Sequence, residues 1–109
     1  MTTPQDIFET QIPAALKANP KVVKELNAII HFNLTGKNGG VWTLDATVTP
    51  AVVTAGALGK PHLTMTVNAD DFVKIRQKKA NPQILAMQGK LKMTPFDVGL
   101  ALKLARVLG

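Results

Sequence analysis

The chain has 109 residues, of which 46% are hydrophobic and 18% are charged, and its formal net charge at pH 7 is +6. This length and balance predict one folded domain and exclude a disordered chain. Because the sequence contains no cysteine, serine or tyrosine, disulfides, thiolate metal sites and most covalent nucleophiles are excluded as well.

Neither histidine, His31 or His62, has a carboxylate beside it in the sequence. We therefore predict no catalytic residue, no metal site and no cofactor. The sequence has no run of about 18 apolar residues, which a membrane span needs, and no basic segment followed by an apolar one at its N-terminus. We expect a cytoplasmic protein.

Four predicted helices begin with a capping residue that is followed by proline or an acidic residue. The expected capping residues are Thr3, Asn68, Asn81 and Thr94. The side-chain oxygen of such a residue accepts a hydrogen bond from a free backbone N–H of the first turn, which stabilises the start of the helix. Pro13 interrupts the first helix, over residues 7–16, and should bend or break it; Asn19 and Pro20 should end it.

Strands are predicted where the hydrophobic period changes from about 3.6 to about 2. The predicted strands cover residues 28–34, 42–48, 51–55, 63–67 and 91–93. A glycine-rich connection at residues 36–40 joins the first two strands as a hairpin. The order of elements predicts an α+β fold, with a five-stranded, mixed and largely antiparallel sheet whose one face is covered by helices.

The last predicted helix, over residues 96–108, is apolar nearly all the way round. The exceptions are Asp97, Gly99, Lys103 and Arg106, and the last three of them fall on one narrow stripe. We expect this helix to be buried on several sides, to face a partner, or to wall an apolar cavity.

Four segments of the sequence, in this order, are similar to one known family. They are the hairpin over residues 32–44, the strand and helix start over residues 63–72, the segment over residues 81–93, and the segment over residues 99–104. Together they resemble the sterol carrier protein type 2 family, from about residue 7 to the end of the chain. The short N-terminal part is more similar to the free-standing bacterial members, and the last residues lack a Ser-Lys-Leu-like peroxisomal signal.

The resemblance implies a single lipid-binding domain over residues 1–109. Members of this family are small α+β domains with an apolar tunnel. The tunnel takes up fatty acids, fatty acyl-CoA, sterols or other lipids, and the domain transfers them without catalysing a reaction. We therefore expect a lipid or fatty acyl ligand.

Apolar residues on the inward faces of strands and on the later helices are the candidates to line such a tunnel. They are Phe32, Trp42, Met65, Phe72, Ile75, Met87, Met93, Phe96, Leu100 and Leu104. For each of them the alternative interpretation is an ordinary core position. Gln88 is the polar candidate: it could meet a ligand head group, or it could cap the carbonyls of the helix before it.

All of the net charge comes from the second half of the chain. Residues 1–59 contain four basic and four acidic residues, whereas residues 60–109 contain nine basic and three acidic ones. Six basic residues cluster in sequence around the predicted tunnel mouth: Lys74, Arg76, Lys78, Lys79, Lys90 and Lys92. Our hypothesis is that they dock transiently on an anionic membrane or meet the phosphates of acyl-CoA; the alternative is a solvated surface that keeps the protein in solution.

A protein-interaction module and a nucleic-acid binder are the alternatives to a lipid carrier. A helix-mediated interaction or oligomerisation module with no lipid ligand would bury Leu102 and Leu108 between subunits, and we expect a monomer or a weak dimer. Nucleic-acid binding is not expected, because only 5% of the residues are aromatic and most of those lie on apolar faces, which leaves no stacking platform.

Overall fold

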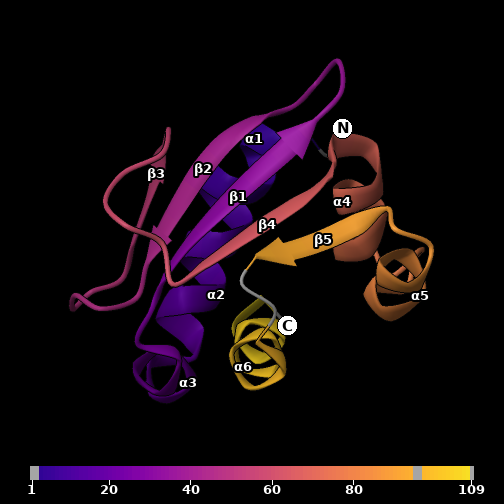
Figure 1. The fold of residues 1–109 in the computed structure, drawn as a ribbon. Helices are drawn as coiled ribbons and strands as arrows, with labels where there is room; N and C mark the ends of the chain where they lie inside the picture. The colour runs from indigo at the N-terminus through magenta and orange to yellow at the C-terminus, as the bar shows by residue number, and fades with distance from the viewer. Residues whose placement is uncertain (1–2, 95–96, 109) are drawn as a thin grey trace.

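The computed structural model describes residues 3–94 and 97–108 (Figure 1). Its helices are α1 (Pro4–Asp6), the π-helix η1 (Ile7–Gln11), α2 (Ile12–Ala18), α3 (Pro20–Leu26), α4 (Ala69–Arg76), α5 (Pro82–Met87) and α6 (Val98–Leu108). Its strands are β1 (Ile29–Thr35), β2 (Gly40–Asp45), β3 (Val52–Ala55), β4 (Leu63–Asn68) and β5 (Leu91–Thr94).

The five strands form one mixed sheet in the order β3-β2-β1-β4-β5. Strands β1 and β4 are parallel, and the other neighbouring pairs are antiparallel. Helices α1, η1 and α2 lie behind the sheet in Figure 1, α3 and α6 lie below it, and α4 and α5 lie on the side of β5. The predicted α+β class and the mixed, largely antiparallel sheet are confirmed.

The inner face of the sheet carries the strand half of the core. Alternate residues point to this face, and most of those in the three central strands are buried: Ile30, Phe32, Leu34, Leu44, Leu63, Met65 and Val67. The outer face carries polar side chains at the intervening positions, such as Asn33, Thr64 and Lys92. One face of the sheet is therefore buried under helices and the other is polar, as the sequence pattern predicted.

Strand β3 lies at one edge of the sheet, whereas β4 pairs in parallel with β1 on the side away from β2. The chain must therefore cross the sheet between β3 and β4. Residues 56–62 make this crossing over the outer face of the sheet, where Thr43 Oγ1 donates to the Gly56 carbonyl at 2.6 Å. His31 Nε2 lies 2.9 Å from the carbonyl oxygen of Leu58, and His62 Nδ1 accepts from the Ile29 N–H at 3.0 Å. His62 directly precedes β4, and both histidines hold this crossing in place.

The N-terminal helix does not break at Pro13. The proline lies in the first turn of α2, and the preceding five residues form η1, in which the Ile12 N–H reaches back to the carbonyl of Ile7. A proline ring clashes with the carbonyl four residues earlier, and one wider turn removes that clash without ending the helix. Helix α2 ends before Asn19 as predicted, but the short helix α3 that follows was not predicted.

Three of the four predicted helix caps are confirmed. Thr3 Oγ1 accepts from the backbone N–H of the third residue after it at 3.1 Å, and Asn68 and Asn81 each accept at 2.8 Å from the residue two positions on. The fourth is wrong: Thr94 lies in β5, paired with Thr64, and Asp97 Oδ1 caps α6 by accepting from the Leu100 N–H at 3.0 Å. The difference arises because β5 extends to Thr94 and takes it out of the helix.

Candidate functional site

Phe8 lies at the centre of an aromatic cluster between the sheet and the helices. Its ring stacks on Trp42 at a centroid distance of 5.0 Å and on Phe72 at 5.3 Å, with interplanar angles of 7° and 5°. The ring of Phe32 is tilted against Phe8 at 5.0 Å and 59°. Stacked and tilted aromatic pairs at these distances are favourable beyond the area that they bury. The cluster therefore ties η1, the sheet and α4 together.

Each ring reaches the cluster because of its place in an element. Phe32 and Trp42 are direct partners in the β1–β2 ladder, so both point to the inner face. Phe72 lies in α4, close behind the capped start of that helix, and is buried. The sequence analysis missed Phe8, although Phe8, Ile12 and Leu16 follow the helical i, i+4, i+8 spacing and all three are buried.

Met65 and Met93 continue the apolar layer toward the edge of the sheet. They are direct partners across β4 and β5 and so share the inner face. Met65 is buried and Met93 is half-buried. Methionine is unbranched and flexible, so this part of the layer can change shape more readily than one built from branched side chains.

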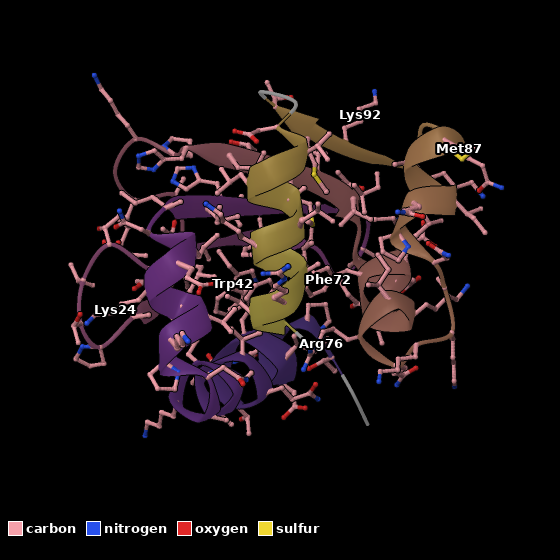
Figure 2. The ribbon with its side chains drawn as sticks, turned by 90° about the horizontal axis from the view of Figure 1, so that it is seen from below. Lys24, Trp42, Phe72, Arg76, Met87 and Lys92 are labelled. Atoms are coloured by element: carbon pink, nitrogen blue, oxygen red, sulfur yellow. The ribbon has the colours of Figure 1, made fainter. Side chains whose placement is uncertain are left out.

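Eight of the eleven residues predicted to bind a ligand gather in this one core. They are Phe32, Trp42, Met65, Phe72, Ile75, Met93, Leu100 and Leu104, of which Trp42, Ile75, Met93 and Leu100 are only partly buried. Figure 2 shows the labelled Trp42 and Phe72 near the middle of the molecule, by α6. The structure thus brings together side chains from β1, β2, β4, β5, α4 and α6, which are far apart in the sequence.

Met87 and Gln88 lie apart from this core. The Met87 side chain is 86% exposed, and Figure 2 shows it at the margin of the molecule. Gln88 is exposed at the C-terminal end of α5, where its backbone N–H donates to the Ile84 carbonyl at 3.0 Å. The helix ends there because Gly89 takes a φ of +75°, which a residue with a side chain rarely adopts. Phe96, the remaining candidate, lies outside the described residues.

Helix α6 is less buried than its composition suggested. It packs against α2 and α3 through Leu104 and Val107, which are both buried. Leu100 is half-buried, whereas Leu102 is 57% exposed and Val98 is similarly exposed. The expectation that this helix is buried on several sides is therefore wrong for its N-terminal half, where apolar side chains meet solvent.

The six predicted basic contact residues divide into two groups. The five lysines, at positions 74, 78, 79, 90 and 92, are exposed. Arg76 is half-buried at the end of α4, and its Nη2 donates to Gln11 Oε1 at 3.5 Å. Gln11 Nε2 in turn donates to Asp6 Oδ2 at 3.0 Å. Burial lowers the pKa of the Arg76 guanidinium. Because it is half-buried and hydrogen-bonded to Gln11, Arg76 belongs to the joint between α4 and the N-terminal helix.

Two open surface depressions, of about 350 and 360 Å³, lie outside the apolar layer. The first is lined by Thr35, Thr66, Val67, Asn68, Asp71, Gly89, Lys90 and Lys92. The second is lined by Ile29, Thr43, Asp45, Val48, Val52, Thr54, Leu58 and Gly59. Neither is lined by the aromatic cluster or the methionine pair, so the apolar tunnel stays a prediction.

Within residues 3–94 and 97–108, no group of three or more His, Asp or Glu side chains is arranged to hold a metal ion. In the same part of the chain, every helix is too short or too polar to cross a bilayer.

Comparison with known proteins gives relatives that are much longer than this chain. Hydroxysteroid dehydrogenase-like protein 2 of Xenopus tropicalis is 37% identical over 92 residues, which are 84% of this chain and 22% of the relative. Peroxisomal multifunctional enzyme A of Dictyostelium discoideum is 37% identical over 90 residues, 81% of this chain and 20% of the relative. The chain spans about a fifth of the length of these relatives.

Solved structures of similar size share the fold over nearly the whole chain. The sterol carrier protein domain 2 of Helicoverpa armigera has a TM-score of 0.75 at 28% identity and covers 98% of this chain and 90% of its own. Sterol carrier protein 2 of Yarrowia lipolytica, in its apo form, has a TM-score of 0.72 at 31% identity, with 95% and 82% covered. Palmitated SCP2L2 from Aedes aegypti has a TM-score of 0.75 at 27% identity, with 98% and 95% covered.

Residues 9–109 match the sequence model of the SCP-2 sterol transfer family. This match agrees with the likeness to the solved sterol carrier protein structures. The chain belongs to this family.

Proposed function

We propose that this domain binds one apolar lipid in the layer between the sheet, α4 and α6, and carries it between membranes without catalysing a reaction. The observation that carries the proposal is the gathering of eight candidate side chains from distant parts of the sequence into one apolar layer, four of them only partly buried. Membership of the SCP-2 sterol transfer family and the palmitated Aedes aegypti relative support it.

The driving force for such binding is the removal of the acyl chain from water. Each buried methylene group gains about 0.8 kcal/mol, so a chain of about 14 methylenes gains roughly 11 kcal/mol before the costs of ordering are subtracted. A micromolar dissociation constant needs only about 8 kcal/mol net. Because no polar contact is required, we expect little selectivity among fatty acids, fatty acyl-CoA and sterol-like lipids.

Space for the ligand would come from the most solvent-exposed part of the layer. Met93 and Leu100 are partly buried, and Leu102 on the same helix is exposed. Movement of the methionine side chains and of the N-terminal half of α6 would open the layer, while Leu104 and Val107 keep the other half of α6 in place on α2 and α3.

We further propose that the exposed lysines at positions 74, 78, 79, 90 and 92 meet phosphate groups, either on an anionic membrane or on acyl-CoA. Lys90 and Lys92 support this because both line the same open depression. The attraction is screened by salt. Exchange of a fluorescent fatty acid between anionic vesicles should therefore slow at least about tenfold from about 50 to about 500 mM NaCl, and an exchange rate independent of salt would contradict it.

A cytoplasmic location stays a prediction.

The experiment that tests the ligand site is native mass spectrometry of the protein purified as expressed and after addition of palmitate. Wild-type protein should carry one lipid per chain. Leu100→Asp should lose it, because a carboxylate inside the apolar layer would lose its hydration, whereas Leu102→Asp, on the exposed side of the same helix, should retain it. Circular dichroism checks that both variants are folded.

Two outcomes would contradict the proposal. If wild-type protein takes up no lipid, the domain is not a lipid carrier. If folded Leu100→Asp retains the lipid as well as Leu102→Asp does, the ligand lies elsewhere. The rival function, an oligomerisation module that uses the exposed Leu102, predicts a dimer by size-exclusion mass and its dissociation by Leu102→Asp.

A further inference from the structure

Helix α5 carries two large apolar side chains that are mostly exposed to solvent. It has six residues and is fixed by one buried side chain, that of Leu85, which packs in the core while α5 lies against β5. Ile84 is 52% exposed and Met87 is 86% exposed. They are three residues apart and so share one face of the helix. A large apolar side chain that is almost fully in water calls for an explanation.

The sequence on both sides of α5 is basic, although Asp71 lines the same depression as Lys90 and Lys92. Residues 72–96 contain six basic and no acidic residues, whereas the rest of the chain contains the remaining seven basic residues and all seven acidic ones. Lys79 and Lys90 adjoin the two ends of α5, and backbone hydrogen bonds hold both: the Lys79 N–H donates to the Lys74 carbonyl at 2.8 Å, and the Lys90 N–H to that of Leu85 at 2.8 Å. Exposed apolar side chains are therefore set between lysines.

We propose that α5 is the part of the domain that enters a membrane, with Ile84 and Met87 in the interfacial layer of an anionic bilayer and the flanking lysines on lipid phosphates. Apolar residues with lysines beside them are typical of elements that lie in the membrane interface. This inference rests on the proposed function, since it names the surface through which the carrier meets its donor and acceptor membranes.

A bilayer fits this surface better than a protein partner does. A stable protein interface buries about 800 Å² on each side and includes a well-packed centre, which two side chains on a six-residue helix do not provide. A bilayer needs no complementary shape. Docking through α5 would also bring β5, and with it the half-buried Met93, close to the lipid surface.

The chain contains no cysteine, so one introduced cysteine can carry an environment-sensitive fluorophore. Met87→Cys labelled with such a dye should brighten and shift to shorter wavelength on vesicles with about 30% phosphatidylserine, and much less on pure phosphatidylcholine. Leu58→Cys is the matched control, because Leu58 is 52% exposed but lies in the segment that crosses the outer face of β1 and β2. Its dye should not respond.

A second pair of variants tests the energetics of insertion. Ile84→Gln combined with Met87→Gln should weaken binding to the anionic vesicles about tenfold, and Leu58→Gln should leave it unchanged. Equal responses of the two dyes, or equal vesicle affinity of the two Gln variants, would overturn the proposal. So would a dye at position 87 that ignores vesicles but responds to an acidic protein, since the surface would then bind protein. Palmitate binding by wild-type protein in vesicle-free solution tests the proposed function separately.

Discussion

The rings of Phe8 and Phe72 lie nearly parallel, 5° apart in orientation and 5.3 Å between centroids. Phe8 belongs to η1 and Phe72 to α4, so this contact joins the N-terminal helix to the helix that follows β4. Because Trp42 stacks on Phe8 as well, the two helices and the sheet share one set of contacts.

Loss of the Phe8 ring should therefore destabilise the whole domain. Phe8→Ala removes a fully buried ring from the centre of the cluster, and large-to-small changes of this kind cost about 3–5 kcal/mol. Urea denaturation followed by circular dichroism measures the change. Phe8→Leu, which keeps most of the volume, should cost clearly less; equal losses would show that the ring itself contributes little.

The β1–β2 hairpin sets the register that brings Phe32 opposite Trp42, and Gly39 is one residue of its turn that has no room for a side chain. A Cβ atom at Gly39 would lie 2.1 Å from the carbonyl oxygen of Leu34, so the turn would have to move. Gly39→Ala should cost at least about 1–3 kcal/mol of stability. Gly40→Ala is the control, because its Cβ would meet nothing closer than 3.7 Å. A hairpin that tolerates both changes equally would contradict this geometry.

Two residues three positions apart, Thr94 and Asp97, can be compared directly as the N-terminal cap of α6. Asp97→Ala removes the oxygen that accepts from the Leu100 N–H and should cost about 1 kcal/mol, seen as a lower Tm. Thr94→Ala, in the exposed end of β5, should change stability by less than about 0.5 kcal/mol. A larger loss of stability for Thr94→Ala than for Asp97→Ala would show that Thr94 is the cap.

Much of the fold could be predicted because local patterns and tertiary structure agree. Alternation placed all five strands, and side chains that cap their own helix marked Asn68 and Asn81. The cap at Asp97 was missed because Thr94, three residues earlier, offers the same capping chemistry, and only pairing with β4 assigns Thr94 to a strand. The π-helix was missed because Pro13 alone does not say whether a helix breaks or widens.

The candidate site could be predicted in part for the same reason. Phe32, Trp42 and Met65 were assigned to the inner face by alternation, which is a local property. Met87 was expected to line the tunnel but is exposed in this structure, because α5 is short and which of its faces meets the core depends on its contact with β5 rather than on its sequence. Phe8 was missed because its role depends on three rings brought together from other elements.

Whether a lipid occupies the apolar layer, as we propose, can be measured at the methionine methyl groups. NMR spectra of protein with isotope-labelled methionine methyl groups, recorded during addition of palmitate in vesicle-free solution, separate the half-buried Met93 and buried Met65 from the exposed Met87. With palmitate in the layer, the signals of Met65 and Met93 should shift strongly and that of Met87 almost not at all. Unchanged Met65 and Met93 signals at saturating palmitate would contradict the proposal.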